Sequence, residues 1–334
     1  MAHMPRYGFN FQWMFAPPGK DPAEPDKRAL DFLATFGFDF VRIPTNYRVW
    51  TPDFEYFHPQ ERYFDYLDRY LAACRARKIH MSLNMHRVPG YCINGNDQER
   101  HNLWLDKIAQ DGFTYQWEVL ARRFLGVPAA DLSFDLVNEP PAPGQYGMTL
   151  ANHAAIIRRV AAAIRAIDPA RPISIDGLDG GYLAMPELAD LGAAHSGRGY
   201  APHAISHYQA TWWPEWRTAP ENPIWPELVF NGKVWNLDTL REVYQPWRDV
   251  QTKGVEIHIG EMGCFNRLPN AVALAWFKDL LGLFKEFAWG FAFWNFEGPF
   301  GIINHGRAGS RYEKLHGYQV DRDLLDFILA SRVP

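Results

Sequence analysis

The sequence predicts a single α/β domain folded as a (β/α)8 (TIM) barrel, and three observations support this prediction. Short apolar segments typical of buried strands alternate with segments whose apolar residues recur at helical spacing. Eight such strand segments fall within 334 residues, a length that fits one large barrel. No glycine-rich phosphate loop follows the first strand, whereas a doubly wound nucleotide-binding sheet, the alternative fold, would require one.

The predicted strands are the apolar runs, taken in chain order. They cover residues 7–11, 38–43, 80–83, 132–137, 173–175, 204–206, 255–259 and 290–293. In the helix predicted over residues 61–77, Phe64, Leu67 and Leu71 fall on one face. Further helices are predicted over residues 114–124, 150–167, 237–253 and 270–287. The connection after residues 173–175 shows the weakest helical pattern.

Composition and charge exclude several classes of protein. Hydrophobic residues make up 47% of the chain and charged residues 22%, so a sizeable core is expected and disorder is not. Lys and Arg number 34 against 38 Asp and Glu, a net charge of −4, which provides no basic surface for nucleic acid or anionic lipid. No apolar run approaches the roughly 18 residues of a membrane span. We therefore expect neither a nucleic-acid nor a membrane partner.

Three cysteines are too few for a disulfide scaffold, and a reducing compartment is the simpler expectation. Residues 1–4 are typical of a cloning remnant, which leaves residues 5–334 for the barrel domain. No signal peptide is visible. The location is therefore left open: the cytoplasm if the chain is full length, or export if a signal peptide was trimmed.

Polar side chains follow the predicted strands, where a barrel gathers its active site. Glu139 and Glu261 are two carboxylic acids at strand ends, and glycoside hydrolysis requires such a pair. One acid protonates the leaving oxygen, while the other attacks the anomeric carbon or activates water. Arg42 beside Glu261 would favour an anionic nucleophile, and Asn138 could hold a substrate 2-hydroxyl group. Glu256 is a rival to Glu261, but its place within a strand favours pairing with a core cation.

An ordered set of motifs resembles glycoside hydrolase family 5, the cellulase-type family of retaining (β/α)8 glycosidases. The resemblance spans residues 6 to about 328, and its motifs are Val41-Arg42-Ile43-Pro44, Asn84-Met85-His86-Arg87, Val137-Asn138-Glu139-Pro140, Gly260-Glu261 and Phe293-Trp294-Asn295. It implies that Glu139 is the acid/base and Glu261 the nucleophile. It further implies supporting roles for Arg42 and Asn138, substrate-site histidines at His86 and His207, and a sugar platform at Trp294.

The sequence departs from this family after the predicted sixth strand. Members usually carry His-x-Tyr there, and the Tyr hydroxyl bonds the nucleophile. Residues 206–209 read Ser-His-Tyr-Gln, so Gln209 stands where Tyr is expected. Two interpretations remain: Tyr208 fills the role after a local bulge, or Gln209 donates its amide instead.

The segment between Gln209 and Asn236 is rich in tryptophan and proline, and a loop this long is usually functional. Its indoles could stack on sugar faces, or they could form a small core that holds the loop closed. We expect ligand contacts from Trp213 and Trp216. Trp50 and Trp104, in the second and third strand-to-helix loops, are further candidates.

Together these features predict a retaining β-glycoside hydrolase that resembles an endo-β-1,4-glucanase, acting on β-linked glucan or related oligosaccharides. An exo-acting β-glycosidase of the glucosidase or mannosidase type, or a β-mannanase acting on short substrates, is the alternative. A non-catalytic sugar-binding barrel is the alternative from a different class, although it would be expected to lack one carboxylate. No His-x-His occurs for a metal-dependent amidohydrolase, and no predicted strand ends in the lysine of a Schiff-base aldolase. We expect a monomer with a carbohydrate partner and without metal or cofactor.

Overall fold

A computed structural model describes residues 6–333 and contains a closed barrel of eight parallel strands. The strands neighbour one another in the order β1-β10-β9-β6-β5-β4-β3-β2. β1 closes the ring by pairing with both of its neighbours, so Phe9 lies opposite Val41 and Phe293. The strands are β1 (Tyr7–Asn10), β2 (Phe40–Asn46), β3 (His80–Arg87), β4 (Leu132–Asp135), β5 (Ile173–Asp176), β6 (Ala194–Gly199), β9 (Ile257–Met262) and β10 (Gly290–Phe293). This confirms the predicted fold class; the predicted remnant, residues 1–4, lies outside the described residues.

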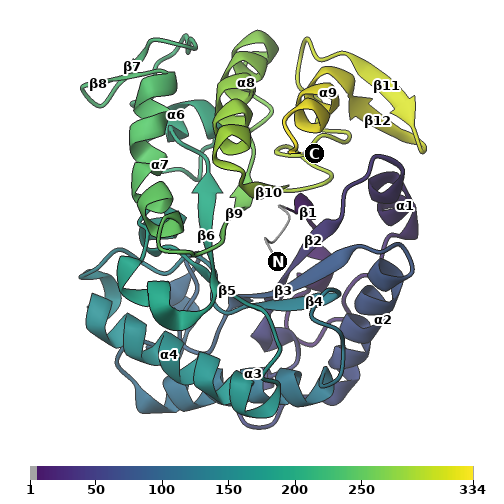
Figure 1. Cartoon of the computed structure of the whole chain (residues 1–334), viewed down its shortest axis with the longest axis vertical. Helices are drawn as coiled ribbons and strands as arrows, with labels where there is room; N and C mark the ends of the chain where they lie inside the picture. Colours follow the sequence, from purple (N-terminus) through teal and green to yellow (C-terminus); the bar gives the residue numbers. More distant parts are fainter. Residues whose placement is uncertain (1–5, 334) are drawn as a thin grey trace.

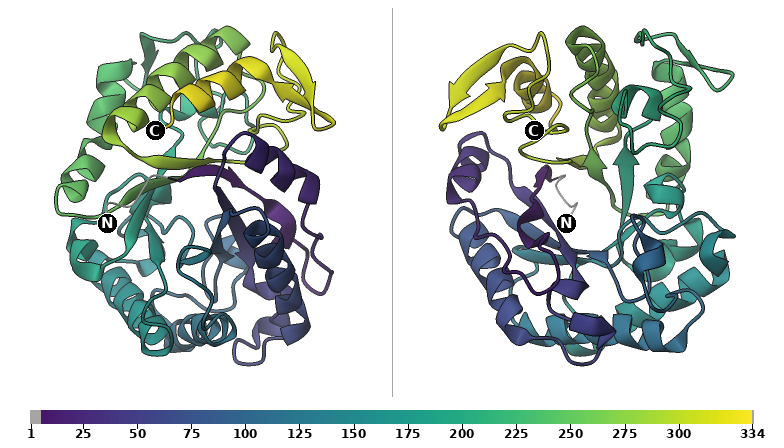
Figure 2. Two further views of the ribbon diagram at one scale, coloured as in Figure 1. Left: turned by 45° about the vertical axis from the view of Figure 1, so that its right-hand side comes forward. Right: turned by 180° about the vertical axis from the view of Figure 1, so that it is seen from behind.

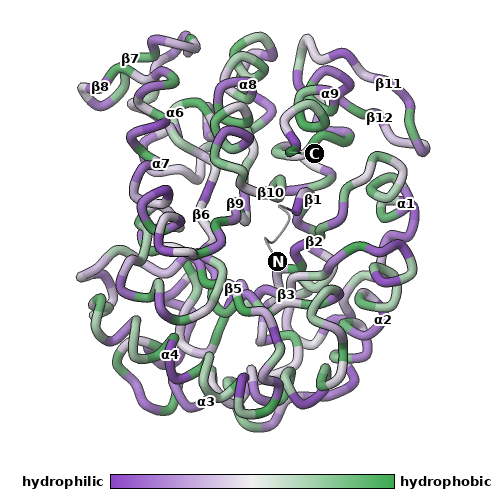
Figure 3. The backbone as a smooth tube through the Cα atoms, in the orientation of Figure 1, coloured by the Kyte–Doolittle hydropathy of each residue, from purple (hydrophilic) through white to green (hydrophobic). Residues whose placement is uncertain are grey.

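The helices surround the strands, as Figures 1 and 2 show. They are α1 (Lys27–Thr35), α2 (Phe64–Arg75), α3 (Lys107–Arg123), α4 (Leu150–Ile167), α5 (Leu178–Gly181), α6 (His203–Ser206), α7 (Leu237–Gln251), α8 (Asn270–Phe287) and α9 (Arg322–Ala330). In Figure 3 the tube alternates between hydrophobic and hydrophilic residues along α3 and α4, because one face of each helix packs on the barrel. A capping box between Thr149 and Asn152 begins α4. No helix in residues 6–333 is long and apolar enough to cross a bilayer.

The prediction for the sixth strand was wrong. Residues 204–206 lie in α6, and the strand is β6, ten positions earlier, with the sequence Ala-His-Ser-Gly-Arg-Gly. It lacks an apolar run because its neighbours require small residues: a Cβ at Gly199 would lie 2.6 Å from the Cβ of Met262. Its backbone pairs with β5 and β9 on either side, so the ladder holds a strand that hydrophobicity does not reveal.

Three other strands end a few residues away from their predicted ends, which changes whether certain site residues lie within a strand or after it. β3 extends past His86, and β9 extends past Glu261, so both side chains belong to strands and do not follow them. β4 ends at Asp135, which leaves Asn138 and Glu139 in the loop beyond it. Two hairpins decorate the barrel, β7 (Leu228–Phe230) with β8 (Lys233–Trp235) beside α7, and β11 (Tyr312–Leu315) with β12 (Tyr318–Asp321) beside α9 (Figure 1). All three cysteines are free and buried.

Arg171 ties together the loops that precede β4 and β5. The Arg171 residue is only 3% exposed. Its guanidinium donates hydrogen bonds to the Asp168 carboxylate at 2.7 Å and to the carbonyl oxygens of Leu132, Phe124 and Val127 at 2.8–3.0 Å. Arg171→Met should therefore lower the free energy of unfolding by about 3–5 kcal/mol, because it leaves a buried carboxylate unpaired. Arg159→Met, which breaks only an exposed pair with Asp111, should cost below about 1 kcal/mol. If urea denaturation gave the same loss in the free energy of unfolding for both variants, Arg171 would not have the structural role described here.

Candidate active site

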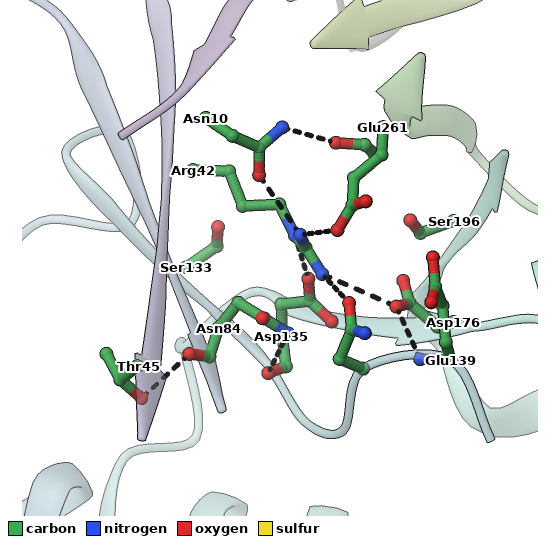
Figure 4. A network of polar contacts seen from close by, with 12 residues as sticks. Asn10, Arg42, Thr45, Asn84, Ser133, Asp135, Glu139, Asp176, Ser196 and Glu261 are labelled. Atoms are coloured by element: carbon green, nitrogen blue, oxygen red, sulfur yellow. Dashed lines mark hydrogen bonds and ion pairs between the residues drawn. The ribbon is translucent and has the colours of Figure 1, made fainter. Parts of the chain in front are cut away.

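Arg42, on β2, lies at the centre of the barrel mouth with its guanidinium almost fully buried. Nη1 donates to Glu261 Oε1 at 2.5 Å and to Asn10 Oδ1 at 3.0 Å. Nε donates to Asp135 Oδ2 at 2.6 Å, and Nη2 donates to Asn138 Oδ1 at 2.9 Å. Figure 4 shows the Arg42 side chain reaching toward Asn10, Glu261 and Asp135, which come from three other parts of the barrel. A buried cation requires such partners, so Arg42 fixes where Glu261 points.

A second buried guanidinium, Arg198 on β6, was missed by the sequence analysis. Its Nε donates to Glu139 Oε1 at 2.7 Å, and its Nη2 donates to Asn138 Oδ1 at 2.9 Å. The same Nη2 lies 3.6 Å from Glu261 Oε1, and Nη1 and Nη2 both bond the Asp176 carboxylate. One side chain thus contacts both of the predicted catalytic acids.

Tyr200 supplies the hydroxyl that the sequence analysis sought at residues 208 and 209. Its OH donates to Glu261 Oε2 at 3.3 Å. Tyr208 instead donates to the Glu221 carbonyl at 2.6 Å, and Gln209 Nε2 donates to the Tyr208 hydroxyl. The prediction that Tyr208 or Gln209 contacts Glu261, the predicted nucleophile, was therefore wrong, and it failed because the sixth strand was misplaced. Arg198-Gly199-Tyr200 has the spacing of the His-x-Tyr pattern, with Arg in place of His, and this was the signal available in the sequence.

Glu139 is held by its backbone as well as by its side chain. Its φ angle is +47°, in the left-handed region that a non-glycine residue seldom adopts. The amide N–H donates to Asp176 Oδ2 at 3.0 Å, and the carbonyl oxygen accepts from the Tyr91 hydroxyl at 2.6 Å. These contacts on both sides of the residue hold the conformation and aim the carboxyl at Arg198.

Two guanidiniums and four carboxyl groups share this cluster, so the acids cannot all be equally ionised. Burial and the charge of Glu261 raise the pKa of Glu139 to about 7, against the opposing effect of Arg198. Burial and the charge of Asp176 raise the pKa of Asp135 to about 7 as well. Burial opposes ionisation of Asp176 too, but Arg198 and Arg42 hold its pKa below the usual value. Asp176 thus serves as an anionic partner, and Glu139 can hold a proton near neutral pH.

His86 and Trp294 lie together at the mouth. Their rings stack with centroids 5.5 Å apart, and Phe15 covers His86 edge-on at 5.1 Å. Burial, followed by the charges of Arg42 and Arg198, lowers the pKa of His86 well below its ordinary value, so its ring is neutral. Within residues 6–333, His86 Nδ1 and Asn138 Nδ2 are buried polar atoms without a hydrogen-bond partner. Both atoms therefore keep a hydrogen-bonding capacity that no described residue uses.

A cavity of about 1040 Å³ opens beside Glu139. Among the described residues, its lining includes Glu139 and the loops after β3, β4, β5 and β6, but not Glu261 or Trp294. Burial lowers the pKa of His203 to about 4 and that of His207 to about 3, so both lining imidazoles are neutral. The aromatic lining residues are Tyr91, Tyr146, Tyr182, Tyr200, Trp212, Trp213, Phe230 and Trp235.

The predicted tryptophans divide between this cavity and the core. Trp213 lines the cavity and stacks on His203, with ring centroids 5.8 Å apart. Trp216 is half-buried beneath the Arg217 guanidinium and is not among the lining residues of the described chain. Trp50 and Trp104 are fully buried in the core, so their prediction as ligand contacts was wrong.

The comparisons with known proteins agree with this architecture. The model of the family "Cellulase (glycosyl hydrolase family 5)" matches residues 5–298. Endoglucanase C of Acetivibrio thermocellus is 26% identical over 307 residues, covering 84% of this chain and 87% of that protein. A β-xylosidase of Phanerodontia chrysosporium is 26% identical over 240 residues, covering 70% of this chain and 46% of that protein.

Solved structures share the fold. A crystal structure of a glycoside hydrolase superposes with a TM-score of 0.97 at 61% identity, covering 99% of this chain and 100% of that one. Thermotoga maritima Cel5A in complex with mannotriose superposes with a TM-score of 0.76 at 18% identity, covering 97% of each chain. The family match confirms the resemblance that the sequence motifs carry, and it shows that this chain belongs to glycosyl hydrolase family 5, the cellulase family, and is a glycoside hydrolase.

Proposed function

We propose that the protein is a retaining β-glycoside hydrolase of the endoglucanase type, with Glu139 as acid/base and Glu261 as nucleophile. The observation that carries this proposal is the convergence of both carboxyl groups on the Arg198 guanidinium. Two acids that share one guanidinium and lie in different environments suit one proton donor and one anion, and the resemblance to the retaining family 5 glycosidases supports direct attack by that anion on the anomeric carbon. The 26% identity with Endoglucanase C over most of both chains supports a β-linked glucan as substrate.

In the first half of the proposed reaction, a Glu261 oxygen bonds the anomeric carbon while Glu139 gives its proton to the leaving glycosidic oxygen. The hydrogen bond from Tyr200 and the ion pair with Arg42 orient Glu261 for this attack. A pKa of about 7 keeps Glu139 protonated in slightly acid solution, as a general acid requires. In the second half, water attacks the same carbon and passes its proton to Glu139.

The substrate would lie across the mouth, with its two halves in different surroundings. We place the reacting sugar on Trp294, within reach of the free polar atoms of His86 and Asn138. The leaving part enters the cavity beside Glu139, since the proton donor must face the leaving oxygen. A volume of about 1040 Å³ exceeds what a single ring requires, so an oligosaccharide leaving group stacking on Trp213 fits this side.

Glu261→Ala should lower kcat/KM on cellotetraose and soluble β-glucan by at least about 10³-fold, because it removes the nucleophile. Cellotetraose binding, followed by calorimetry, should persist because the aromatic walls are unchanged. Glu256→Gln is the matched control: Glu256 lines a small pocket with His80 and His258 at the amino ends of the strands, away from Glu261. Activity lost in Glu256→Gln and kept in Glu261→Gln would overturn the assignment of the nucleophile.

Glu139→Ala should discriminate between leaving groups. Turnover of cello-oligosaccharides, whose leaving oxygen needs a proton, should fall by about 10²–10⁴-fold. The bond-breaking step with dinitrophenyl β-cellobioside should be nearly spared, because its phenolate leaves unaided. Equal losses in single-turnover rates on both substrates would show that Glu139 is not the acid.

The pH profile should reflect the raised pKa of Glu139. On cellotetraose, kcat/KM should fall as the pH rises through about 7, because the acid then loses the proton it must donate. Initial rates between pH 4 and 9 measure this limb. A plateau that extended through pH 9 would contradict the assignment.

A further inference from the structure

We propose that Arg198 is a positioning residue for Glu139: it occupies oxygen Oε1, leaves Oε2 to exchange the proton, and serves mainly the second half of the reaction. This inference rests on the proposed function. Arg198 occupies the place of the histidine that the family resemblance leads one to expect, and it contacts Glu139 directly.

The Arg198 guanidinium is fixed on several sides at once. Beyond its 2.7 Å bond to Glu139 Oε1, Nη1 donates to Asp176 Oδ1 at 3.2 Å and to Ser196 Oγ at 3.1 Å. Nη2 donates to Asn138 Oδ1 at 2.9 Å. These partners come from the loop after β4, from β5 and from β6, so the side chain cannot turn away without breaking several charged or buried hydrogen bonds.

The surrounding backbone leaves space for this particular side chain. Gly181 has a φ of +86°, and a Cβ atom there would lie 2.5 Å from the Arg198 Cγ. A Cβ atom at Gly260 would lie 3.1 Å from Arg198 Nη1 and would collide with Ser196 Oγ. The Tyr244 hydroxyl donates to the Arg198 carbonyl at 2.9 Å. The arginine therefore occupies a slot formed by close approach of three elements.

Occupation of Oε1 determines which Glu139 oxygen reacts. A guanidinium only donates hydrogen bonds, so Oε1 remains an acceptor whether Glu139 is ionised or protonated. The exchangeable proton must then reside on Oε2. In the first half-reaction this proton passes to the glycosidic oxygen. In the second, a water oxygen bonds the anomeric carbon, a water proton moves to Oε2, and the bond from that carbon to Glu261 breaks, its electron pair returning to the Glu261 carboxylate.

The two halves of the reaction place different charges around Glu139. In the free enzyme the negative charge of Glu261 favours the protonated acid and offsets Arg198. In the glycosyl-enzyme, Glu261 is a neutral ester, so this offset is gone and Arg198 favours ionised Glu139, the form that accepts a proton from water.

The charged groups near Glu139 are Arg198 on β6, Asp176 on β5, Glu261 on β9 and, behind Asn138, Arg42 on β2. The phenols of Tyr91, Tyr182 and Tyr200 and the thiol of Cys92 also lie near Glu139, and burial keeps all four neutral by raising each pKa above its usual value.

The experiment compares wild type, Arg198→Met, Arg198→Lys and Glu139→Ala on dinitrophenyl β-cellobioside, with stopped-flow detection of the phenolate. This leaving group needs no proton, so the first half-reaction proceeds and a slow second half appears as a burst followed by a low steady-state rate. Arg198→Met should show such a burst, with a steady-state kcat lowered by about 10²-fold. Azide should restore the rate and give a glycosyl azide, because azide attacks the anomeric carbon without losing a proton.

Arg198→Lys keeps the positive charge but loses the planar fork, so we expect a smaller, azide-restored loss of about tenfold. This variant carries the test if Arg198→Met does not fold, as judged by circular dichroism. Glu256→Gln is the control and should show neither the burst nor azide sensitivity. Folded Arg198 variants with the wild-type steady-state rate, or with a loss that azide does not restore, would overturn the inference. If Glu139→Ala is restored by azide and the Arg198 variants are not, only this inference fails; if Glu139→Ala is not restored either, the proposed function fails.

Discussion

Two buried guanidiniums organise the mouth of this barrel. Arg42 and Arg198 are each about 1% exposed, and a cation removed from water at this depth must be paired with acids and further hydrogen bonds. Their anionic partners come from β4, the loop after β4, β5 and β9, so pairing succeeds only when the barrel closes in its observed register. The same electrostatic requirement therefore joins the closure of the fold to the placement of Glu139 and Glu261.

The excess of acids over cations gives the carboxyl groups different protonation behaviour. Burial raises the pKa of both Asp135 and Glu139 to about 7, yet only Glu139 borders the cavity, whereas Asp135 is enclosed beneath Arg42. Asp176, which bonds both guanidiniums, has a lowered pKa despite its burial and serves as their anionic counterpart. One cluster thus provides a proton-holding acid at the surface of the site and a fixed negative charge behind it.

The long segment after α6 has two roles, and a different tryptophan serves each of them. Trp225 is buried and its Nε1 donates to Asp279 at 2.9 Å, which fastens the segment to α8. Trp213 stacks on His203 and lines the cavity. Trp225 thus anchors the segment to the barrel, and Trp213 contributes to the cavity wall. The hairpin β7–β8 extends this wall through Phe230 and Trp235.

The sequence by itself determined the barrel, seven of its eight strands to within a few residues, the family, and the positions of Arg42, Asn138 and Glu261 around one centre. Apolar runs and helical periodicity carry that information locally. Only the tertiary structure located β6. Its Ser-Gly-Arg-Gly stretch has no local hydrophobic pattern, because backbone pairing with β5 and β9 and close contacts hold it in place. With β6 came Arg198 and Tyr200, and their contacts with Glu139 and Glu261 join residues 59 and 61 positions apart. Packing likewise decided which tryptophans line the cavity, because the sequence alone does not distinguish an indole buried in the core from one that borders a cavity.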